Sequence, residues 1–139
     1  MKRLGLSIAV KRGISSVIVT SEGMVLAKRV YSLPSEFKDK STNTKLIETL
    51  KSGLILVKGF VDASKDDCNL VIECNNSILI NWVKKGMSTD AYIEPFFDMM
   101  NVLHQLPAVI DFHYTQHPKA LMFATADNLT VSKLSGLLD

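Results

Sequence analysis

The sequence has few cysteines and no long apolar run, and each of these features excludes a class of protein. Its 139 residues include only two cysteines, Cys68 and Cys74, which are too few for a disulfide framework. No apolar run approaches the roughly 20 residues that a membrane-spanning helix needs. The basic N-terminus is followed by too few apolar residues for a signal peptide. We therefore expect an intracellular, cytoplasmic protein in a reducing setting, with no membrane partner.

The sequence also lacks a strong excess of one charge and the short motifs of several common enzyme classes. The 16 Lys and Arg residues and 14 Asp and Glu residues leave a net charge of +2, so overall charge does not call for a nucleic-acid partner. There is no phosphate-binding GxxxxGK[ST] loop, no GxSxG and no HExxH. Positive residues do form adjacent pairs, each of which is either solvated surface or a phosphate contact. The pairs are Lys2-Arg3, Lys11-Arg12, Lys28-Arg29 and Lys84-Lys85.

The apolar content is that of one globular domain over residues 1–139, with 47% hydrophobic residues. A chain of this length buries roughly two-thirds of its unfolded surface and needs no disulfide or metal to fold. The first third has β character, because its apolar runs are separated by the short turns KRG and SEG. These runs, at 4–10, 14–20 and 24–33, predict an antiparallel meander, since parallel neighbours need a longer crossover.

The rest of the chain alternates between helical and extended patterns. Apolar residues recur at helical spacing over 45–60, where Gly53 predicts close packing against the sheet. The other predicted elements are strand 68–74, helices 77–86 and 90–106, strand 108–114 and a final helix 121–138. The expected fold class is therefore α/β: a five-stranded mixed sheet in the order β-β-β-α-β-α-α-β-α, with helices on both faces.

This order, together with four local segments, resembles the ribonuclease H family over nearly the whole chain. The segments are STNTKLIETL (41–50), ECNNSILINWVKKG (73–86), DFHYTQH (111–117) and ATADNLT (124–130). The resemblance implies an RNase H-like fold. It also implies an activity, because members of the family cut the RNA strand of an RNA–DNA hybrid with two Mg²⁺ ions held by four acids.

Three of the four acids that the resemblance implies are missing. The positions that correspond to the acids and to a nearby loop histidine are Ser7 or Ile8, Ile47, Asn75 or Asn76, Asp127, and His117. Only Asp127 is a carboxylate. Glu48 follows Ile47, but a shift of one residue turns a helix position by about 100°, so its side chain should point elsewhere. The remaining weak candidates for metal ligands are Asp127, Glu73 and Glu48.

Several of these residues also have a purely structural interpretation. Asn75 and Asn76 suit the start of the helix that follows them, and Asp127 suits the start of the last helix. His113 and His117 are four residues apart but lie in a strand and a loop, so they do not predict a zinc site. The apolar residues Phe96, Phe97, Met99 and Met100 are either core or, if one face is exposed, a protein interface.

Three functional hypotheses follow. The first is a catalytically inactive RNase H-like domain, without a cofactor, that binds RNA–DNA hybrid or single-stranded nucleic acid. Its phosphate contacts would be Lys11, Arg12, Lys84 and Lys85. The second is a protein-interaction or assembly scaffold, with a protein partner or a second copy bound through the sheet edge or the third helix. The third is a residual Mg²⁺-dependent ribonuclease that uses Asp127, Glu73 and Glu48.

Overall fold

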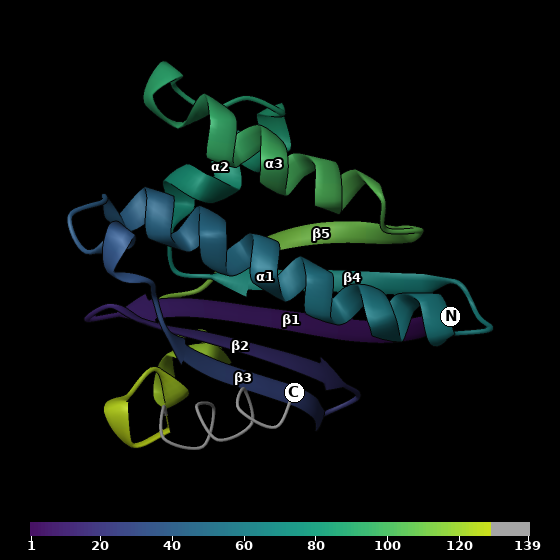
Figure 1. The fold of residues 1–139 in the computed structure, drawn as a ribbon. Coiled ribbons are helices and arrows are strands. Elements are labelled where there is room, and N and C mark those ends of the chain that lie inside the picture. The colour runs from purple at the N-terminus through teal and green to yellow at the C-terminus, as the bar shows by residue number, and fades with distance from the viewer. Residues whose placement is uncertain (129–139) are drawn as a thin grey trace.

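A five-stranded mixed sheet forms the centre of the molecule in the computed structural model, which describes residues 1–128 (Figure 1). Its order is β3-β2-β1-β4-β5; the first three strands pair antiparallel, and β4 and β5 continue the sheet parallel to β1. The strands are β1 (Lys2–Lys11), β2 (Ile14–Ser21), β3 (Met24–Ser32), β4 (Cys68–Cys74) and β5 (Ala108–Tyr114). The predicted mixed sheet and its meander are confirmed.

The two hairpin turns of the meander have the backbone that two-residue connections favour. Arg12 and Gly13 have φ values of 52° and 78°, and Glu22 and Gly23 have 50° and 84°. Positive φ at both central residues is the type I′ geometry, whose twist matches that of the flanking strands. Arg12 is thereby fixed at the tip of the β1–β2 turn, at the end of the sheet where the candidate site lies.

One face of the sheet is covered by α1 (Thr42–Ala63), α2 (Ser77–Lys85) and α3 (Ile93–His104), and the opposite face by the 3-10 helix η3 (Lys119–Phe123) (Figure 1). On that second face Ala120 packs with Ala9 and Ile18, and the Lys28 ammonium lies 4.5 Å from the centre of the Phe123 ring. None of the helices described is long and apolar enough to cross a membrane.

Two predicted helices differ from those observed. The helix expected at 90–106 is divided into the 3-10 helix η2 (Asp90–Tyr92) and α3, because Tyr92 departs from helical backbone and Pro95 lies in the first turn of α3. The helix expected from residue 121 was wrong at its start, since Lys119–Phe123 form η3 and Ala124 interrupts the helical backbone. The backbone is helical again at 126–128, and the rest of that prediction lies outside the described residues.

The main core lies between the sheet and the three α-helices. It contains the apolar stripe that the sequence predicts for α1, in which Leu50 and Leu54 are fully buried, and α1 packs on β1 and β2. A Cβ atom on Gly53 would lie 3.1 Å from Leu6 Cδ1 and 3.2 Å from Val17 Cγ1. The predicted close packing of Gly53 against the sheet is confirmed, because a Cβ atom there would make tighter contacts than side chains ordinarily do.

Candidate functional site

The carboxyl ends of β1 and β4 and the N-termini of α1 and α2 meet at one end of the sheet (Figure 1). Ser7 on β1 and Glu73 on β4 are direct partners in the parallel register. Both side chains lie on the face of the sheet opposite α1, because Leu6 and Ile72, their neighbours in sequence, belong to the core beneath α1.

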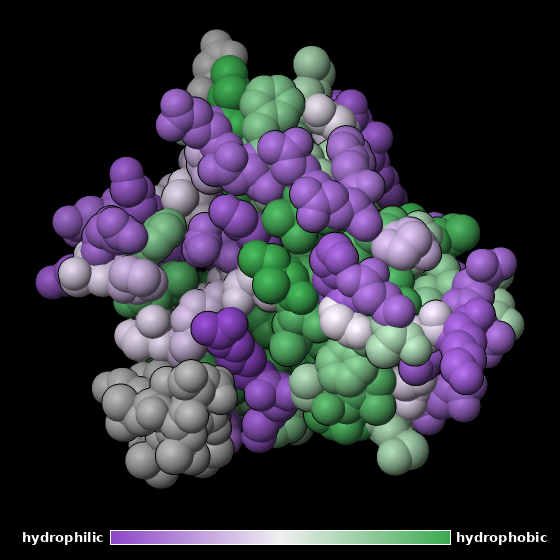
Figure 2. Space-filling view, turned by 45° about the vertical axis from the view of Figure 1, so that its right-hand side comes forward, coloured by the Kyte–Doolittle hydropathy of each residue, from purple (hydrophilic) through white to green (hydrophobic). Residues whose placement is uncertain are grey.

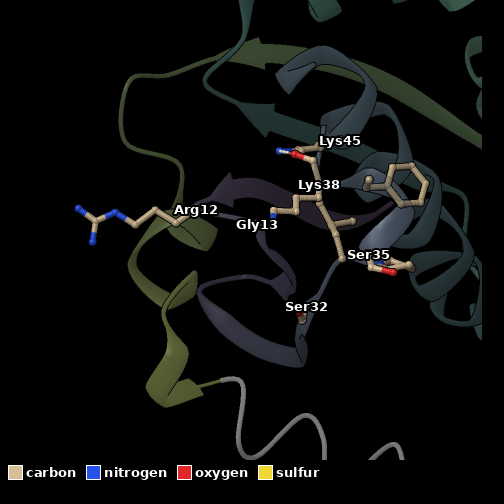
Figure 3. Close-up of a pocket in the computed structure, with 9 residues that line it drawn as sticks. Arg12, Gly13, Ser32, Ser35, Lys38 and Lys45 are labelled. Atoms are coloured by element: carbon tan, nitrogen blue, oxygen red, sulfur yellow. Dashed lines mark hydrogen bonds between the residues drawn. The ribbon is translucent and has the colours of Figure 1, made fainter. Parts of the chain in front are cut away.

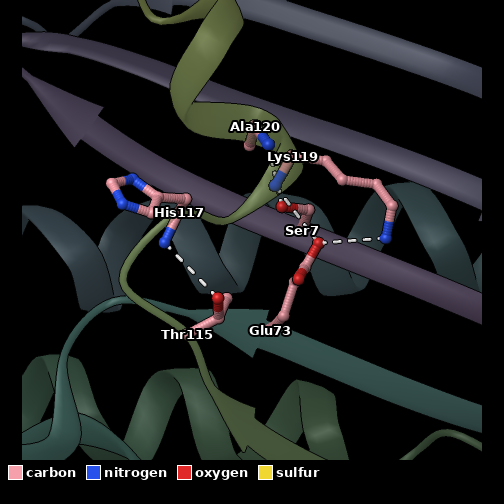
Figure 4. A network of polar contacts seen from close by, with 6 residues as sticks. All are labelled: Ser7, Glu73, Thr115, His117, Lys119 and Ala120. Atoms are coloured by element: carbon pink, nitrogen blue, oxygen red, sulfur yellow. Dashed lines mark hydrogen bonds and ion pairs between the residues drawn. The ribbon is translucent and has the colours of Figure 1, made fainter.

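The first residues of η3 form hydrogen bonds with the side chains of Ser7 and Glu73 (Figure 4). The Ala120 backbone N–H donates to Ser7 Oγ at 2.8 Å, and Ser7 is only 3% exposed. The Lys119 backbone N–H donates to Glu73 Oε1 at 3.2 Å, and the Lys119 ammonium lies 3.4 Å from the same oxygen. The strand carboxylate at this point is therefore already paired with a positive charge of the chain itself.

The position expected to hold the acid of the first helix belongs to the hydrophobic core. Ile47 is 1% exposed, and Glu48 beside it is half-buried. Close to Ile47 on the same helix, the Thr49 hydroxyl donates to the Lys45 carbonyl at 2.8 Å. It also lies 2.8 Å from the Ser15 hydroxyl on β2. No pattern in the sequence indicated this buried hydroxyl pair, because its members are 34 residues apart.

The two asparagines after β4 have different roles. Asn76 caps α2, since its Oδ1 accepts from the Leu79 N–H at 3.0 Å, and its Nδ2 donates to Asn43 Oδ1 at 2.8 Å. This second bond ties the start of α2 to the start of α1. Asn75, the other position at which the resemblance would place an aspartate, is exposed. The capping interpretation is thus confirmed for Asn76 alone.

Asn76→Ala is expected to lower the free energy of unfolding by about 1–2 kcal/mol, because both the cap and the link to Asn43 are lost. The measurement is urea denaturation followed by circular dichroism. Asn75→Ala is the matched control and should change stability by less than about 0.5 kcal/mol, since its side chain is exposed. Equal losses in the two variants would contradict the capping role.

His117 and Asp127 do not complete an acidic cluster with Glu73. The His117 backbone N–H donates to Thr115 Oγ1 at 3.4 Å, and its ring points away from Ser7 and Glu73 in Figure 4. Asp127 is exposed. Over residues 1–128, no group of three or more His, Cys, Asp or Glu side chains is placed to hold a metal ion. A single carboxylate paired with a lysine does not fit a two-magnesium centre, which needs several negative charges.

Cys74 lies at the end of β4, beside this site. Burial raises the pKa of its thiol and the charge of Glu73 adds to the rise, while a backbone hydrogen bond at Asn76 opposes it. The folded state therefore favours the neutral thiol, and this contribution to stability is complete below the ordinary pKa of 9.0.

The free energy of unfolding is expected to fall as the pH rises above 9.0, the ordinary thiol pKa, and on through the raised pKa of Cys74, because the unfolded chain ionises first. Urea denaturation over a series of alkaline pH values measures this fall. Cys74→Ala should show a shallower slope than the natural chain. Parallel slopes for the natural chain and Cys74→Ala would contradict the role of Cys74.

A cationic cavity of about 490 Å³ opens between the β1–β2 turn and the connection from β3 to α1 (Figure 3). Its charged lining residues are Arg12, Lys38 and Lys45, and no acidic residue lines it within the described chain. Lys38 and Lys45 lie on one wall, with the Lys45 ammonium 3.5 Å from the Lys38 carbonyl, and the Arg12 guanidinium extends outward from the rim. We call this cavity, with its charged lining residues Arg12, Lys38 and Lys45, the Arg12 pocket.

The four cationic residues predicted to contact phosphate lie in two separate places in the structure. Arg12 lines the pocket and Lys11 is exposed at the end of β1 beside it. Lys84 and Lys85 are exposed in the last turn of α2, where Lys84 lines a different cavity. Sequence reasoning missed Lys38 and Lys45, although the polar segment between β3 and α1 is rich in lysine.

The four apolar residues predicted on the third helix divide between core and surface. Phe96, Met99 and Met100 are buried, and Trp82 packs against Tyr92 and Phe96 at ring-centre distances of 5.1 and 6.4 Å. Phe97 alone among the four predicted residues is exposed, at 53%. In Figure 2 hydrophobic residues reach the surface in narrow areas bordered by hydrophilic ones.

The chain matches no protein-family model and no curated protein. Its fold is similar to that of solved RNase H1 structures. LC11-RNase H1, isolated from compost and solved in complex with RNA/DNA hybrid, superposes with a TM-score of 0.69 at 12% identity, over 99% of each chain. The N-terminal RNase H domain of Rv2228c from Mycobacterium tuberculosis gives 0.69 at 8% identity, over 98% of this chain and 99% of that one. RNase H1 from the archaeon Halobacterium salinarum gives 0.62 at 11%, over 96% and 98%. The chain therefore has an RNase H-like fold.

Proposed function

We propose that this RNase H-like domain binds nucleic acid without cutting it. The observation that carries the proposal is the pairing of Glu73 with Lys119 beside the hydrogen bond from Ala120 to Ser7. These contacts fill the place where the resemblance expects metal-binding acids. A lysine ammonium there balances the one strand carboxylate, so little negative charge remains to attract Mg²⁺.

The Arg12 pocket supports a phosphate-binding role for the same end of the sheet. Arg12, Lys38 and Lys45 line one cavity with no acidic neighbour among its described lining, and Lys11 adds a further charge at the rim. Ammonium and guanidinium groups that neutralise phosphates release condensed counterions, which supplies most of a sequence-independent affinity. Lys84 and Lys85, at the end of α2, are proposed as a second phosphate contact. LC11-RNase H1, of similar fold, was solved with an RNA/DNA hybrid.

Fluorescence anisotropy with labelled RNA–DNA hybrid, duplex DNA and single strands tests binding at two salt concentrations. We expect salt-sensitive binding that favours the hybrid or a single strand. If three phosphates are neutralised, the slope of log affinity against log salt concentration should be about −3. A parallel assay with Mg²⁺ or Mn²⁺ should show no cleavage of the hybrid. Lack of binding at low salt would overturn the binding role, and cleavage that Asp127→Asn abolishes would overturn the inactive one.

A further inference from the structure

Strand β5 has an unpaired edge. It pairs with β4 on one side and has no other strand beside it in the described part of the chain. The Thr115 N–H donates to the Cys74 carbonyl at 3.0 Å, so the backbone of that residue points toward β4. Because backbone direction alternates along a strand, Ile110, Phe112 and Tyr114 direct their N–H and C=O groups away from the sheet.

A groove of about 530 Å³, most of whose lining residues are apolar, lies beside this edge, between β5, the end of α2 and the second half of α3. Its volume is within the range of roughly 300–1,000 Å³ that is usual for binding pockets. Four of its apolar lining residues are 7% exposed, and every other buried hydrophobic residue of the described chain is 4% exposed or less. These four are Val83, Met100, Leu103 and Leu106. These four buried side chains therefore form the apolar floor of the groove.

The charged rim of the groove indicates what fits it. Lys84 at the end of α2 and His104 at the end of α3 are exposed lining residues, and neither forms an ion pair within residues 1–128. Asp111 also lines the groove, but it alternates with Ile110 and Phe112, which pack on the core beneath the helices. Its side chain therefore lies on the opposite face of the sheet, and the helix side of the rim presents a cation and an imidazole.

We propose that β5 and this groove bind an extended, acidic-apolar segment of a partner protein, which adds to the sheet as a further strand. The segment would pair with the outward backbone groups of Ile110, Phe112 and Tyr114. One large apolar side chain would enter the groove. A carboxylate two residues away would reach Lys84, because alternate residues of a strand face the same side. This site is separate from the Arg12 pocket, and Lys84 is the one residue that both proposals use.

A random peptide library displayed on phage and selected on the full chain tests the specificity. Enriched sequences should pair a large apolar residue with Asp or Glu two positions away, and absence of this pattern would overturn the proposal. The enriched peptide, labelled and measured by anisotropy, should bind Lys84→Glu about tenfold more weakly. The matched variant Lys85→Glu and the variant Arg12→Glu should bind it normally, and equal losses at Lys84 and Lys85 would overturn the charge assignment.

Amide hydrogen exchange on the peptide complex tests strand addition directly. Exchange at Ile110, Phe112 and Tyr114 should slow on binding, and N-methylation of the peptide amides that face β5 should abolish binding while methylation of the alternate amides does not. Unchanged exchange would mean that the groove binds a side chain or small molecule without strand pairing, which overturns the proposal. A stable homodimer that excludes the peptide would overturn it as well, because a second copy would then occupy the edge.

Discussion

Ser7→Asp is expected to lower the free energy of unfolding by about 3–5 kcal/mol, which is the cost of leaving a buried charge uncompensated. Ser7 is 3% exposed, and its register partner on β4 is Glu73. The new carboxylate would therefore be desolvated beside a like charge, with the Lys119 ammonium already paired to Glu73. Urea denaturation at neutral pH in metal-free buffer measures the loss.

Two companion variants separate charge from shape at this position. Ser7→Asn has nearly the same volume as Ser7→Asp without its charge, so its loss should be much smaller. Glu73→Gln in the Ser7→Asp background should restore most of the stability, which a double-mutant cycle would express as a coupling free energy. Added Mg²⁺ should stabilise Ser7→Asp more than the natural chain, because a cation between two carboxylates removes their repulsion. Equal stability of Ser7→Asp and Ser7→Asn would contradict the predicted repulsion.

The double variant Arg12→Glu/Lys45→Glu is expected to bind RNA–DNA hybrid about 100-fold more weakly at low salt, because two phosphate contacts become repulsive. The slope of log affinity against log salt should become shallower by about two. Both residues line the Arg12 pocket, so their effects report on one contact surface. Anisotropy over a salt series gives both quantities.

Lys2→Glu/Lys65→Glu is the matched control, since it changes the net charge by the same amount. Lys2 begins β1 and Lys65 lies between α1 and β4, at the end of the sheet away from the Arg12 pocket. We expect this control to keep most of its affinity and its full salt slope. If the two double variants lost affinity equally, binding would depend on net charge alone, and the pocket would not be the contact site.

Local pattern in the sequence was sufficient to predict most of the elements. The strands at 68–74 and 108–114 match exactly, because a run of apolar residues between polar segments specifies its own length. Gly86 ends α2 in the left-handed conformation that a glycine cap favours. The errors lie where short-range pattern and backbone geometry conflict, as at 90–92 and after Pro118, where 3-10 turns replace predicted α-helix.

The chemistry of the candidate site was predicted only in outline. The expectation that three acids are missing came from the resemblance, which places Ser7, Ile47 and Asn75 at positions where the family has acids. The contacts that the structure shows around Ser7 and Glu73 could not be predicted. Lys119 and Glu73 are 46 residues apart, and nothing in the local sequence of either indicates the other.

The sequence by itself therefore determined the order of the main elements and the likeness to the ribonuclease H fold. Only the tertiary structure decided that η3 covers Ser7 and Glu73, that Lys38 and Lys45 join Arg12, and that an apolar groove borders the edge of β5. The physical reason is the difference in sequence separation between the interactions. Periodicity and capping act over a few residues, whereas the bond from Ala120 to Ser7 spans 113 residues and forms only once the sheet has closed.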